Sequence, residues 1–347
     1  MFEQSSVTMM RVLLTGFEPF GDNTENVSSK ILDAIDAELI LRDPWASLRG
    51  YSQQPNEVKF TKLILPVDES GSLMVSELIM QGNQWDAIVH TGLCETCDTI
   101  KFETTANNLL HMRMPDNDGR QVVNQVIGDR NLMCSKSVIN AIKYPMVANV
   151  EISNDAGTYL CNETYYRTLE SLARTNRLTA IPTCFIHFPD ESKVALQRSV
   201  DTLSEVVSRL VFKPVIEVVG ALIKKNNQIL LARRKAGLEL SGMWEFPGGK
   251  VEHGESYFDA IKREMKEEFT WEVTPVRKYH TEYHEYQDFG INLHIVEVIL
   301  ETGSMLDTAE LWTSHDDVNW VSESGNANIA PADSGIVDRI LAELNAK

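Results

Sequence analysis

The sequence predicts an α/β protein that is built from two unlike domains. The chain has 347 residues, about twice the length of one compact domain, so two hydrophobic cores are expected. In the first half, short apolar runs alternate with stretches of helical period, which predicts a three-layer α/β/α domain with a mostly parallel, twisted sheet. The second half is rich in strand patterns and has a glycine-rich loop before one strong helix.

The first half begins with an apolar strand over Arg11 to Thr15, a Gly/Pro-punctuated turn over Gly16 to Gly21, and a helix from about Ser28. Four further apolar runs are expected to be strands: Phe60 to Val67, Ala87 to Thr91, Met146 to Ile152 and Thr183 to Phe188. Three segments of helical period follow or separate them: Ser70 to Met80, Asn162 to Ala173, and the amphipathic segment Ser192 to Leu210.

The domain boundary is placed at Lys213-Pro214, where proline ends the helical pattern and a strand-rich section starts. This predicts one domain over residues 1–212 and another over 213–347. The second domain is expected to contain strands at Val215 to Lys224 and Gln228 to Arg233, further strands through Leu300, and a final helix from about Ser334. No internal repeat relates the two halves.

The composition excludes several classes of partner. The formal net charge is −18 and no basic cluster interrupts it, which disfavours binding to a nucleic-acid polymer or an anionic membrane. No apolar run reaches the roughly 20 residues that a membrane-spanning helix needs, and Met1 to Met10 lacks the basic and apolar regions of a secretory leader. We therefore expect a cytoplasmic protein.

The five cysteines are an odd number confined to the first 184 residues, which does not suit a disulfide framework and leaves at least one free thiol. Cys161 is the best candidate for a nucleophile, because it lies where a loop gives way to a helix and a helix N-terminus favours a thiolate. His187 ends an apolar strand, and Glu103 could orient its imidazole. A buried structural cysteine and a structural histidine are the alternatives at this point.

Four segments resemble pyroglutamyl peptidase I, in the family's order. They are Thr15-Gly16-Phe17-Glu18-Pro19-Phe20-Gly21, Arg113-Met114-Pro115-Asp116-Asn117, Ala156-Gly157-Thr158-Tyr159-Leu160-Cys161-Asn162 and Phe185-Ile186-His187. The resemblance covers roughly Met10 to Phe212. It implies a cysteine peptidase without a cofactor, with pyroglutamyl peptides as substrates and self-association of the chain. By resemblance, the catalytic set is Glu103, Cys161 and His187.

The same resemblance implies the residues that bind substrate. Phe17 and Phe20 would pack against the pyrrolidone ring, and Arg113 would shape the site near the developing oxyanion. The segment Leu93 to Cys97 and residue Val27 depart from the family's pattern. The altered loop keeps open an alternative, in which this domain is a non-catalytic binding or regulatory module. The Cys94/Cys97 pair has metal or redox spacing, but without a second such pair we favour an incidental, oxidation-sensitive pair over a zinc site.

In the second half, acidic residues recur at fixed spacings after Gly249. Glu255 follows six residues later, and Arg263-Glu264 begins a segment that continues to Glu267-Glu268. On a helix Glu264, Glu267 and Glu268 share one face, and three crowded carboxylates repel one another unless a cation joins them. Hard oxygen ligands suit Mg²⁺ or Mn²⁺. A solvated acidic helix face is the alternative, but it does not account for the preceding glycine-rich loop.

These spacings resemble the Nudix box of MutT-type hydrolases, which implies an α/β/α sandwich with a mixed sheet and a nucleoside triphosphate substrate. By resemblance, the metal ligands are the Gly248 carbonyl and the carboxylates of Glu264, Glu267, Glu268 and Glu297. Either Glu264 or Glu297 would activate water. Lys250 would contact phosphate, while Glu255 and Arg263 would brace the loop and helix.

Two further positions lie near the ends of helices in this domain. Ala330-Pro331-Ala332-Asp333 resembles a base-reading segment, which makes Asp333 a candidate nucleobase contact, although Asp333 could also act as a helix N-cap. Thr270 replaces the glycine that usually ends the box helix in a left-handed conformation, at a cost of roughly 1 kcal/mol or more.

Together the motifs predict a bifunctional hydrolase. One site would remove N-terminal pyroglutamate, and the other would split nucleoside triphosphates to monophosphate and pyrophosphate with Mg²⁺ or Mn²⁺. Besides the non-catalytic peptidase-like module, a nucleotide sensor without hydrolysis is a further alternative, which the complete carboxylate set disfavours.

Overall fold

The computed structural model describes residues 9–21, 23–51, 53–301, 312–323, 325 and 328–346. The chain forms two compact units, one of Met1–Ala46 with Tyr51–Lys213 and one of Ser47–Gly50 with Pro214–Lys347. Of the opening segment Met1 to Met10, only Met9 and Met10 are described. Within the described ranges, no helix is long and apolar enough to cross a membrane.

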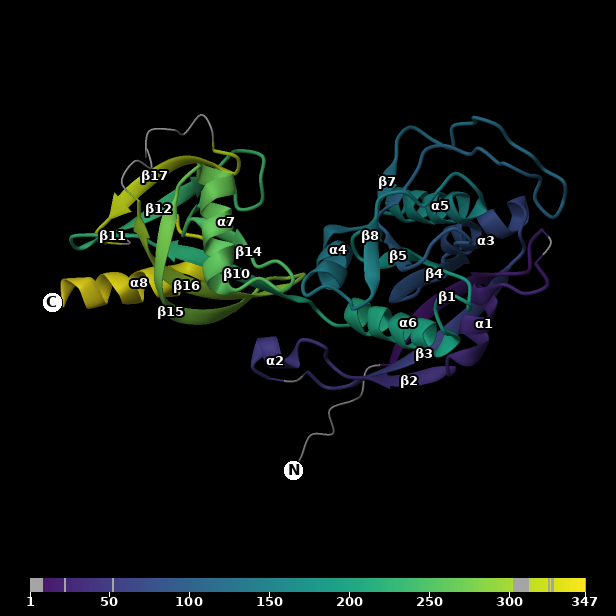
Figure 1. Cartoon of the computed structure of the whole chain (residues 1–347), viewed down its shortest axis with the longest axis horizontal. Coiled ribbons are helices and arrows are strands. Elements are labelled where there is room, and N and C mark those ends of the chain that lie inside the picture. The colour runs from purple at the N-terminus through teal and green to yellow at the C-terminus, as the bar shows by residue number, and fades with distance from the viewer. Residues whose placement is uncertain are drawn as a thin grey trace, which may run out of the picture. The chain divides into compact units, whose positions relative to one another are not determined.

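The first unit is built around a seven-stranded sheet of order β2-β3-β1-β4-β9-β5-β8 (Figure 1). Strands β3, β1, β4 and β9 run parallel, β5 is antiparallel to β9 but parallel to β8, and β2 is antiparallel to β3. The strands are β1 (Met9–Phe17), β2 (Glu38–Leu41), β3 (Asn56–Leu65), β4 (Ala87–Leu93), β5 (Ile100–Glu103), β8 (Val150–Ser153) and β9 (Thr183–Phe188). Two short strands, β6 (Thr105–Ala106) and β7 (Leu132–Met133), pair apart from this sheet.

Helices cover both faces of this sheet, which confirms the predicted three-layer fold with a mostly parallel sheet. Helix α3 packs against α5 on one face, and α6 packs against α1 and α4 on the other. The helices are α1 (Val27–Ala34), α3 (Glu69–Met80), α4 (Lys136–Lys143), α5 (Leu160–Arg174) and α6 (Leu196–Val211). The short helix α2 (Ala46–Arg49) begins at the last residue of Met1–Ala46 in the first unit and continues into Ser47–Gly50, which is assigned to the second unit.

The second unit has two four-stranded sheets, and its mixed strand directions agree with the prediction. In one sheet β10 is parallel to β16 and antiparallel to β14, while β15 is antiparallel to β16. In the other, β12 pairs antiparallel with β11, β13 and β17. The strands are β10 (Val215–Leu222), β11 (Lys224–Lys225), β12 (Gln228–Arg234), β13 (Trp244–Glu245), β14 (Gly248–Lys250), β15 (Val273–Glu285), β16 (Gly290–Leu300) and β17 (His315–Val321), with helices α7 (Tyr257–Phe269) and α8 (Pro331–Asn345).

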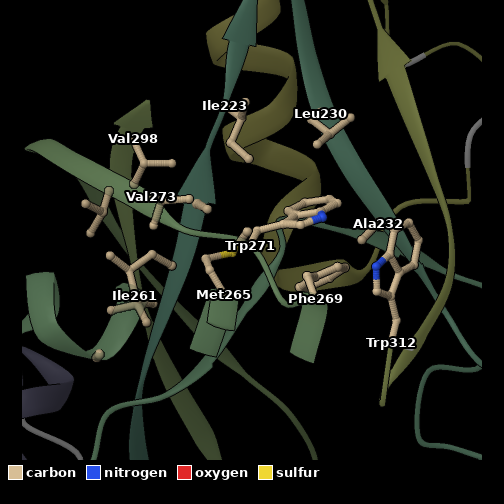
Figure 2. Close-up of a cluster of buried hydrophobic side chains, with 14 of the residues drawn as sticks. Ile223, Leu230, Ala232, Ile261, Met265, Phe269, Trp271, Val273, Val298 and Trp312 are labelled. Atoms are coloured by element: carbon tan, nitrogen blue, oxygen red, sulfur yellow. The ribbon is translucent and has the colours of Figure 1, made fainter. Parts of the chain in front are cut away.

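The core of the second unit fixes which face of α7 is buried. Ile261, Met265 and Phe269 recur every four residues along the helix and are fully buried. Figure 2 shows them directed into a cluster that also holds Trp271 and Trp312. The Phe269 ring stacks on Trp271, with ring centroids 4.6 Å apart. Because this apolar stripe faces inward, Glu264 and Glu268 are partly buried along its flank, whereas Glu267 points to solvent.

Candidate active sites

Cys161 lies in the first turn of α5, two residues after Tyr159, the residue that caps the helix. The thiol is half-buried and free. It faces β4, where a Cβ atom at Gly92 would lie 2.9 Å from the Cys161 Sγ atom. Only glycine at this position of the strand leaves room for the sulfur. The start of the helix and the close strand together hold the thiol in one place.

His187 lies beside this thiol on β9. Strands β4 and β9 pair so that Gly92 is the direct neighbour of His187. The Nδ1 atom of His187 is 2.8 Å from the Oε1 atom of Glu103, which is carried by the adjacent strand β5. Burial alone would lower the pKa of His187, but hydrogen bonds with Cys161 and Glu103 outweigh it and raise this pKa to about 9.

Glu103 is almost completely buried, with a side chain that is 1% exposed. Its Oε2 atom has no hydrogen-bond partner among the described residues, so the imidazole is the main group that compensates its charge. The Tyr165 hydroxyl donates to the backbone carbonyl of Glu103 and helps to fix the end of β5. The structure thus brings together the three residues that the sequence suggested, although they lie 26 to 84 positions apart along the chain.

The three predicted substrate-binding residues differ in how close they lie to this site. The Phe20 ring contacts the ring of Tyr159, with centroids 5.2 Å apart, so it lies at the N-terminus of the nucleophile helix. Phe17 is buried at the end of β1. Arg113 is exposed on a loop whose neighbour His111 donates its backbone N–H to the Thr158 carbonyl. Within the described ranges, no contact joins Arg113 to Cys161, His187 or Glu103.

The loop after β4 carries a disulfide between Cys94 and Cys97. The short loop holds the two residues 5.4 Å apart at Cα, within the range of a disulfide, and an oxidised pair of this kind was not excluded by the sequence. Cys134, Cys161 and Cys184 are free. The backbone N–H of Cys94 donates to the Phe188 carbonyl, which anchors the loop one residue beyond His187.

In the second unit, Arg263 organises the acidic face of α7. Its guanidinium makes two hydrogen bonds of 2.9 Å to the Glu255 carboxylate and donates to the Lys250 carbonyl. It also donates to Glu264 at 2.8 Å and to Glu267 at 3.2 Å. The Arg263 guanidinium therefore connects the helix with the glycine-rich loop that precedes it.

The carboxylates of α7 supply the oxygen donors that a divalent cation prefers. A Cβ atom at Gly249 would lie 2.3 Å from Glu264 Oε2, so this carboxylate occupies the space that the glycine leaves. Burial, aided by the charges of Glu268 and Glu267, raises the pKa of Glu264 although the contact with Arg263 lowers it. The Glu268 Oε2 atom is buried without a hydrogen-bond partner in the described part of the chain. Crowded oxygen donors with an unsatisfied buried atom suit Mg²⁺ or Mn²⁺.

The donors are not gathered into one shell in this structure. No three His, Cys, Asp or Glu side chains among the described residues are placed to share a metal ion. Glu267 is mostly exposed and held by Arg263. The Glu297 carboxylate is bound by two cations, Lys224 at 2.5 Å and Arg277 at 2.9 Å, and not by any residue of α7 within the described ranges. Side chains would have to turn for the predicted ligands to meet.

The two loop residues Gly248 and Lys250 flank Gly249 on β14. A Cβ atom at Gly248 would lie 1.9 Å from the Val219 carbonyl oxygen, so the loop can pass this close to β10 only with glycine. Lys250 is exposed, and its own carbonyl accepts from Arg263. The structure therefore explains the glycines by the close packing of the loop against the sheet.

Asp333 is fully buried in the first turn of α8 and is not its N-cap. The helix begins at Pro331 and its cap is Ala330, which corrects the alternative role proposed from the sequence. Instead, the Asp333 carboxylate accepts from the backbone N–H of Phe246 at 2.9 Å. Burial, followed by the nearby charge of Glu245, raises the pKa of Asp333 to about 8. Near neutral pH the side chain is therefore largely protonated and can donate as well as accept.

Comparisons with known proteins match both units. Residues 10–211 match the family described as pyroglutamyl peptidase, and residues 214–339 match the NUDIX domain. The chain belongs to the pyroglutamyl peptidase family and carries a NUDIX domain. Both domains thus come from hydrolase families.

Relatives of each domain are similar over most of their own length. The pyrrolidone-carboxylate peptidase of Thermococcus kodakarensis is 27% identical over 198 residues, which is 54% of this chain and 85% of the relative. The CTP pyrophosphohydrolase of Escherichia coli is 36% identical over 129 residues, which is 37% of this chain and 92% of the relative. The solved pyrrolidone carboxyl peptidase of Thermococcus litoralis is 23% identical, with a TM-score of 0.49 over 58% of this chain and 94% of that chain.

Sequence reasoning missed residues in both domains. In the pyroglutamyl peptidase domain it did not single out Gly92, although a glycine within an apolar strand is a signal of close approach. In the NUDIX domain it missed His315 and Ser314, which contact Glu268. His315 is fully buried, its Nε2 atom lies 2.8 Å from Glu245, and its Nδ1 atom lies 3.4 Å from Glu268. No spacing rule connects these residues.

Proposed function

We propose that the chain is a bifunctional hydrolase, with a pyroglutamyl-peptide hydrolase in residues 1–212 and a nucleoside triphosphate pyrophosphohydrolase in residues 213–347. The observation that carries the peptidase half is the buried Glu103–His187 pair next to the free Cys161 thiol. The observation that carries the other half is the set of crowded carboxylates beside Gly249, with Arg263 between the loop and the helix.

In the peptidase reaction, the Cys161 thiolate attacks the carbonyl carbon of an N-terminal pyroglutamyl residue. The tetrahedral intermediate collapses when the amide C–N bond breaks, and His187 gives its proton to the departing amine. Water, deprotonated by His187, then hydrolyses the thioester and releases pyroglutamate. Glu103 keeps the imidazole oriented and charged, while backbone N–H groups at the start of α5 stabilise the oxyanion. Phe17, Phe20 and Arg113 are proposed to form the pocket for the pyrrolidone ring.

The peptidase half is tested with a pyroglutamyl-coumarin substrate under reducing conditions. We expect cleavage by the wild type and loss of at least ~10³-fold in kcat for Cys161→Ala, as for removal of other nucleophiles. Cys134→Ala is the matched control, since Cys134 is also a free thiol. Absence of cleavage by the wild type would support a non-catalytic module in place of the peptidase. Full activity of Cys161→Ala would refute the nucleophile.

For the second half, we propose nucleoside triphosphates as substrates, with CTP the first to be tested because the Escherichia coli relative is a CTP pyrophosphohydrolase. Gly248, Glu264, Glu267 and Glu268 would hold Mg²⁺ or Mn²⁺, which when bound neutralises phosphate charge. Attack of water at phosphorus would break one P–O bond and release monophosphate and pyrophosphate. Lys250 would contact the phosphates, and Asp333 the nucleobase.

We assign the proton acceptor for the attacking water to Glu264. Its carboxylate is half-buried beside Gly249 and its pKa is raised, which suits a group that takes up a proton. Glu297 is the weaker candidate because two cations, Lys224 and Arg277, bind its carboxylate and lower its pKa against the effect of burial, whereas the pKa of Glu264 stays raised although Arg263 binds it. The same contacts make Glu297 the weakest of the proposed metal ligands.

The pyrophosphohydrolase half is tested by pyrophosphate release from a panel of normal and oxidised nucleoside triphosphates. We expect release to require Mg²⁺ or Mn²⁺ and to fall by at least ~10²-fold in Glu267→Gln, as for loss of one strong electrostatic contact. Glu272→Gln is the matched control, since Glu272 is an exposed glutamate that pairs with Lys266 just after α7. Equal rates for wild type and Glu267→Gln would show that the metal assignment is wrong.

A further inference from the structure

We propose that His315 is a positioning residue of the NUDIX site, which holds the metal-ligand candidate Glu268 on α7 at a fixed place relative to Glu245 on β13. The inference rests on the proposed pyrophosphohydrolase function and adds a residue that no motif identifies. Its basis is the place of the imidazole between two carboxylates, 2.8 Å from Glu245 on the strand before the glycine-rich loop and 3.4 Å from Glu268 on α7.

The imidazole of His315 has little freedom to move. The side chain is 0% exposed at the start of β17. One ring face stacks on Phe269, with centroids 4.9 Å apart and planes inclined by 23°. Phe269 itself is held in the core cluster of the domain. Packing alone therefore holds the ring in place, independently of its polar contacts.

On one side, the segment that begins β17 holds Glu268. The Ser314 hydroxyl donates to Glu268 Oε1 at 2.7 Å. The Nδ1 atom of His315 lies 3.4 Å from Glu268 Oε2, which is within ion-pair distance but is not a hydrogen bond. The backbone N–H of Thr313 donates to the Glu268 carbonyl at 3.2 Å. Thr313 and Ser314 thus hydrogen-bond to the backbone and the carboxylate of Glu268, and the His315 imidazole lies against the other carboxylate oxygen.

On the other side, the same imidazole contacts Glu245. Its Nε2 atom is 2.8 Å from Glu245 Oε1, which also accepts from Arg234 at 2.7 Å. Glu245 ends β13, three residues before Gly248, whose carbonyl is another candidate metal ligand. His315 therefore connects the helix and the loop that would supply ligands to one cation, in addition to the connection that Arg263 makes at the other end of the acidic face.

A purely structural histidine would not need two carboxylates. Burial of this many polar groups is costly, and an apolar ring of similar size could stack on Phe269 equally well. Ordered partners around a ligand carboxylate hold it in the orientation that binds the metal. Loss of such outer contacts commonly weakens metal binding by about 10- to 100-fold. The arrangement predicts an effect on metal affinity that is separate from any effect on stability.

The test compares His315→Gln with His294→Gln in the full chain. His294 is a buried histidine of the same domain that also faces a carboxylate, Glu217 at 3.3 Å. In the described part of the chain, its hydrogen bonds, ion pairs and ring contacts reach α7 only at Tyr257, at the end of the helix opposite to Glu268. The measurements are Mn²⁺ affinity of the nucleotide-free protein by calorimetric titration, the thermal unfolding midpoint, and separate kcat and KM values for CTP.

We expect His315→Gln to weaken Mn²⁺ binding by about 10-fold or more, while His294→Gln binds Mn²⁺ as the wild type does. At saturating Mn²⁺, we expect His315→Gln to regain most of its kcat. Wild-type Mn²⁺ affinity in a folded His315→Gln variant would overturn the proposal, and so would an equal loss in both variants.

A second variant keeps the test decisive if His315→Gln does not fold. Ser314→Ala removes the other side-chain contact to Glu268 from a half-buried position, and we expect it to weaken Mn²⁺ binding severalfold. Unchanged affinity in Ser314→Ala would then overturn the proposal. Failure of the proposed function looks different, because the wild type itself would then bind no Mn²⁺ at a site that Glu267→Gln removes.

Discussion

At residue 92 the absence of a side chain is a requirement of the peptidase site. A methyl group there would lie 2.9 Å from the Cys161 sulfur and 2.9 Å from the Phe185 ring, closer than carbon atoms normally approach either. We predict that Gly92→Ala displaces the thiol and lowers kcat/KM by at least ~10-fold, since small misplacements at a reacting centre can cost up to about 10²-fold. Hydrolysis of the pyroglutamyl-coumarin substrate measures the effect.

The control for this variant is Gly335→Ala, because a Cβ atom at Gly335 meets nothing within 4 Å. It should leave peptidase activity unchanged. An unaltered kcat/KM in a folded Gly92→Ala variant would show that the thiol does not depend on this strand.

The charge of His187 also belongs to the residue scale. Its pKa is raised to about 9 against burial by Cys161 and Glu103, so the imidazolium persists until the pH rises through that value. We predict that kcat/KM declines on the alkaline side near pH 9. Glu103→Gln removes a charge that favours the imidazolium, so the decline should move to lower pH.

A pH profile of kcat/KM from pH 6 to 10 measures this shift, and kcat/KM reports ionisations of the free enzyme. An alkaline limb that stays in place in Glu103→Gln would contradict the role given to Glu103.

At the scale of elements, the C-terminal end of α7 carries a measurable strain. Thr270 adopts a left-handed conformation with φ of 61°, as anticipated for the position that usually holds glycine. A β-branched residue is disfavoured there by roughly 1–2 kcal/mol. We predict that Thr270→Gly raises the free energy of unfolding of the NUDIX domain by about 1 kcal/mol, whereas Thr270→Ala gives a smaller gain.

Urea unfolding followed by intrinsic tryptophan fluorescence measures this change, since Trp271 is buried directly after the helix. A lower stability for Thr270→Gly would contradict the account of how the helix ends.

Elements with a long, regular pattern could be predicted from the sequence, and those without one could not. The apolar stripe of α7 and the apolar run of β9 gave both their type and their approximate bounds. Strand β5 was missed because it has only four residues and takes its conformation from pairing with β8 and β9. Helix α8 begins three residues earlier than expected, since Pro331 fits its first turn.

The same distinction applies to the sites. Cys161 and the carboxylates of α7 could be found from local position and spacing. Gly92, Ser314 and His315 could not, because their roles come from strand pairing and tertiary contacts between distant segments. The Cys94–Cys97 disulfide depends likewise on the shape of one loop.

At the scale of the whole molecule, each domain holds its own complete set of candidate catalytic residues. Glu103, Cys161 and His187 all come from the first unit, and the carboxylates with their loop all come from the second. Each activity is therefore expected to survive loss of the other. Independent activities are the central prediction for a fusion of two hydrolases.

The most direct test assays both reactions on the wild type, Cys161→Ala and Glu267→Gln, from the same full-length preparations. We predict that the wild type cleaves the pyroglutamyl-coumarin substrate and releases pyrophosphate from CTP or another nucleotide of the panel. Cys161→Ala should lose only the peptidase reaction and Glu267→Gln only pyrophosphate release. A wild type that lacks either reaction, or a variant that keeps the activity assigned to the altered residue, would contradict the account.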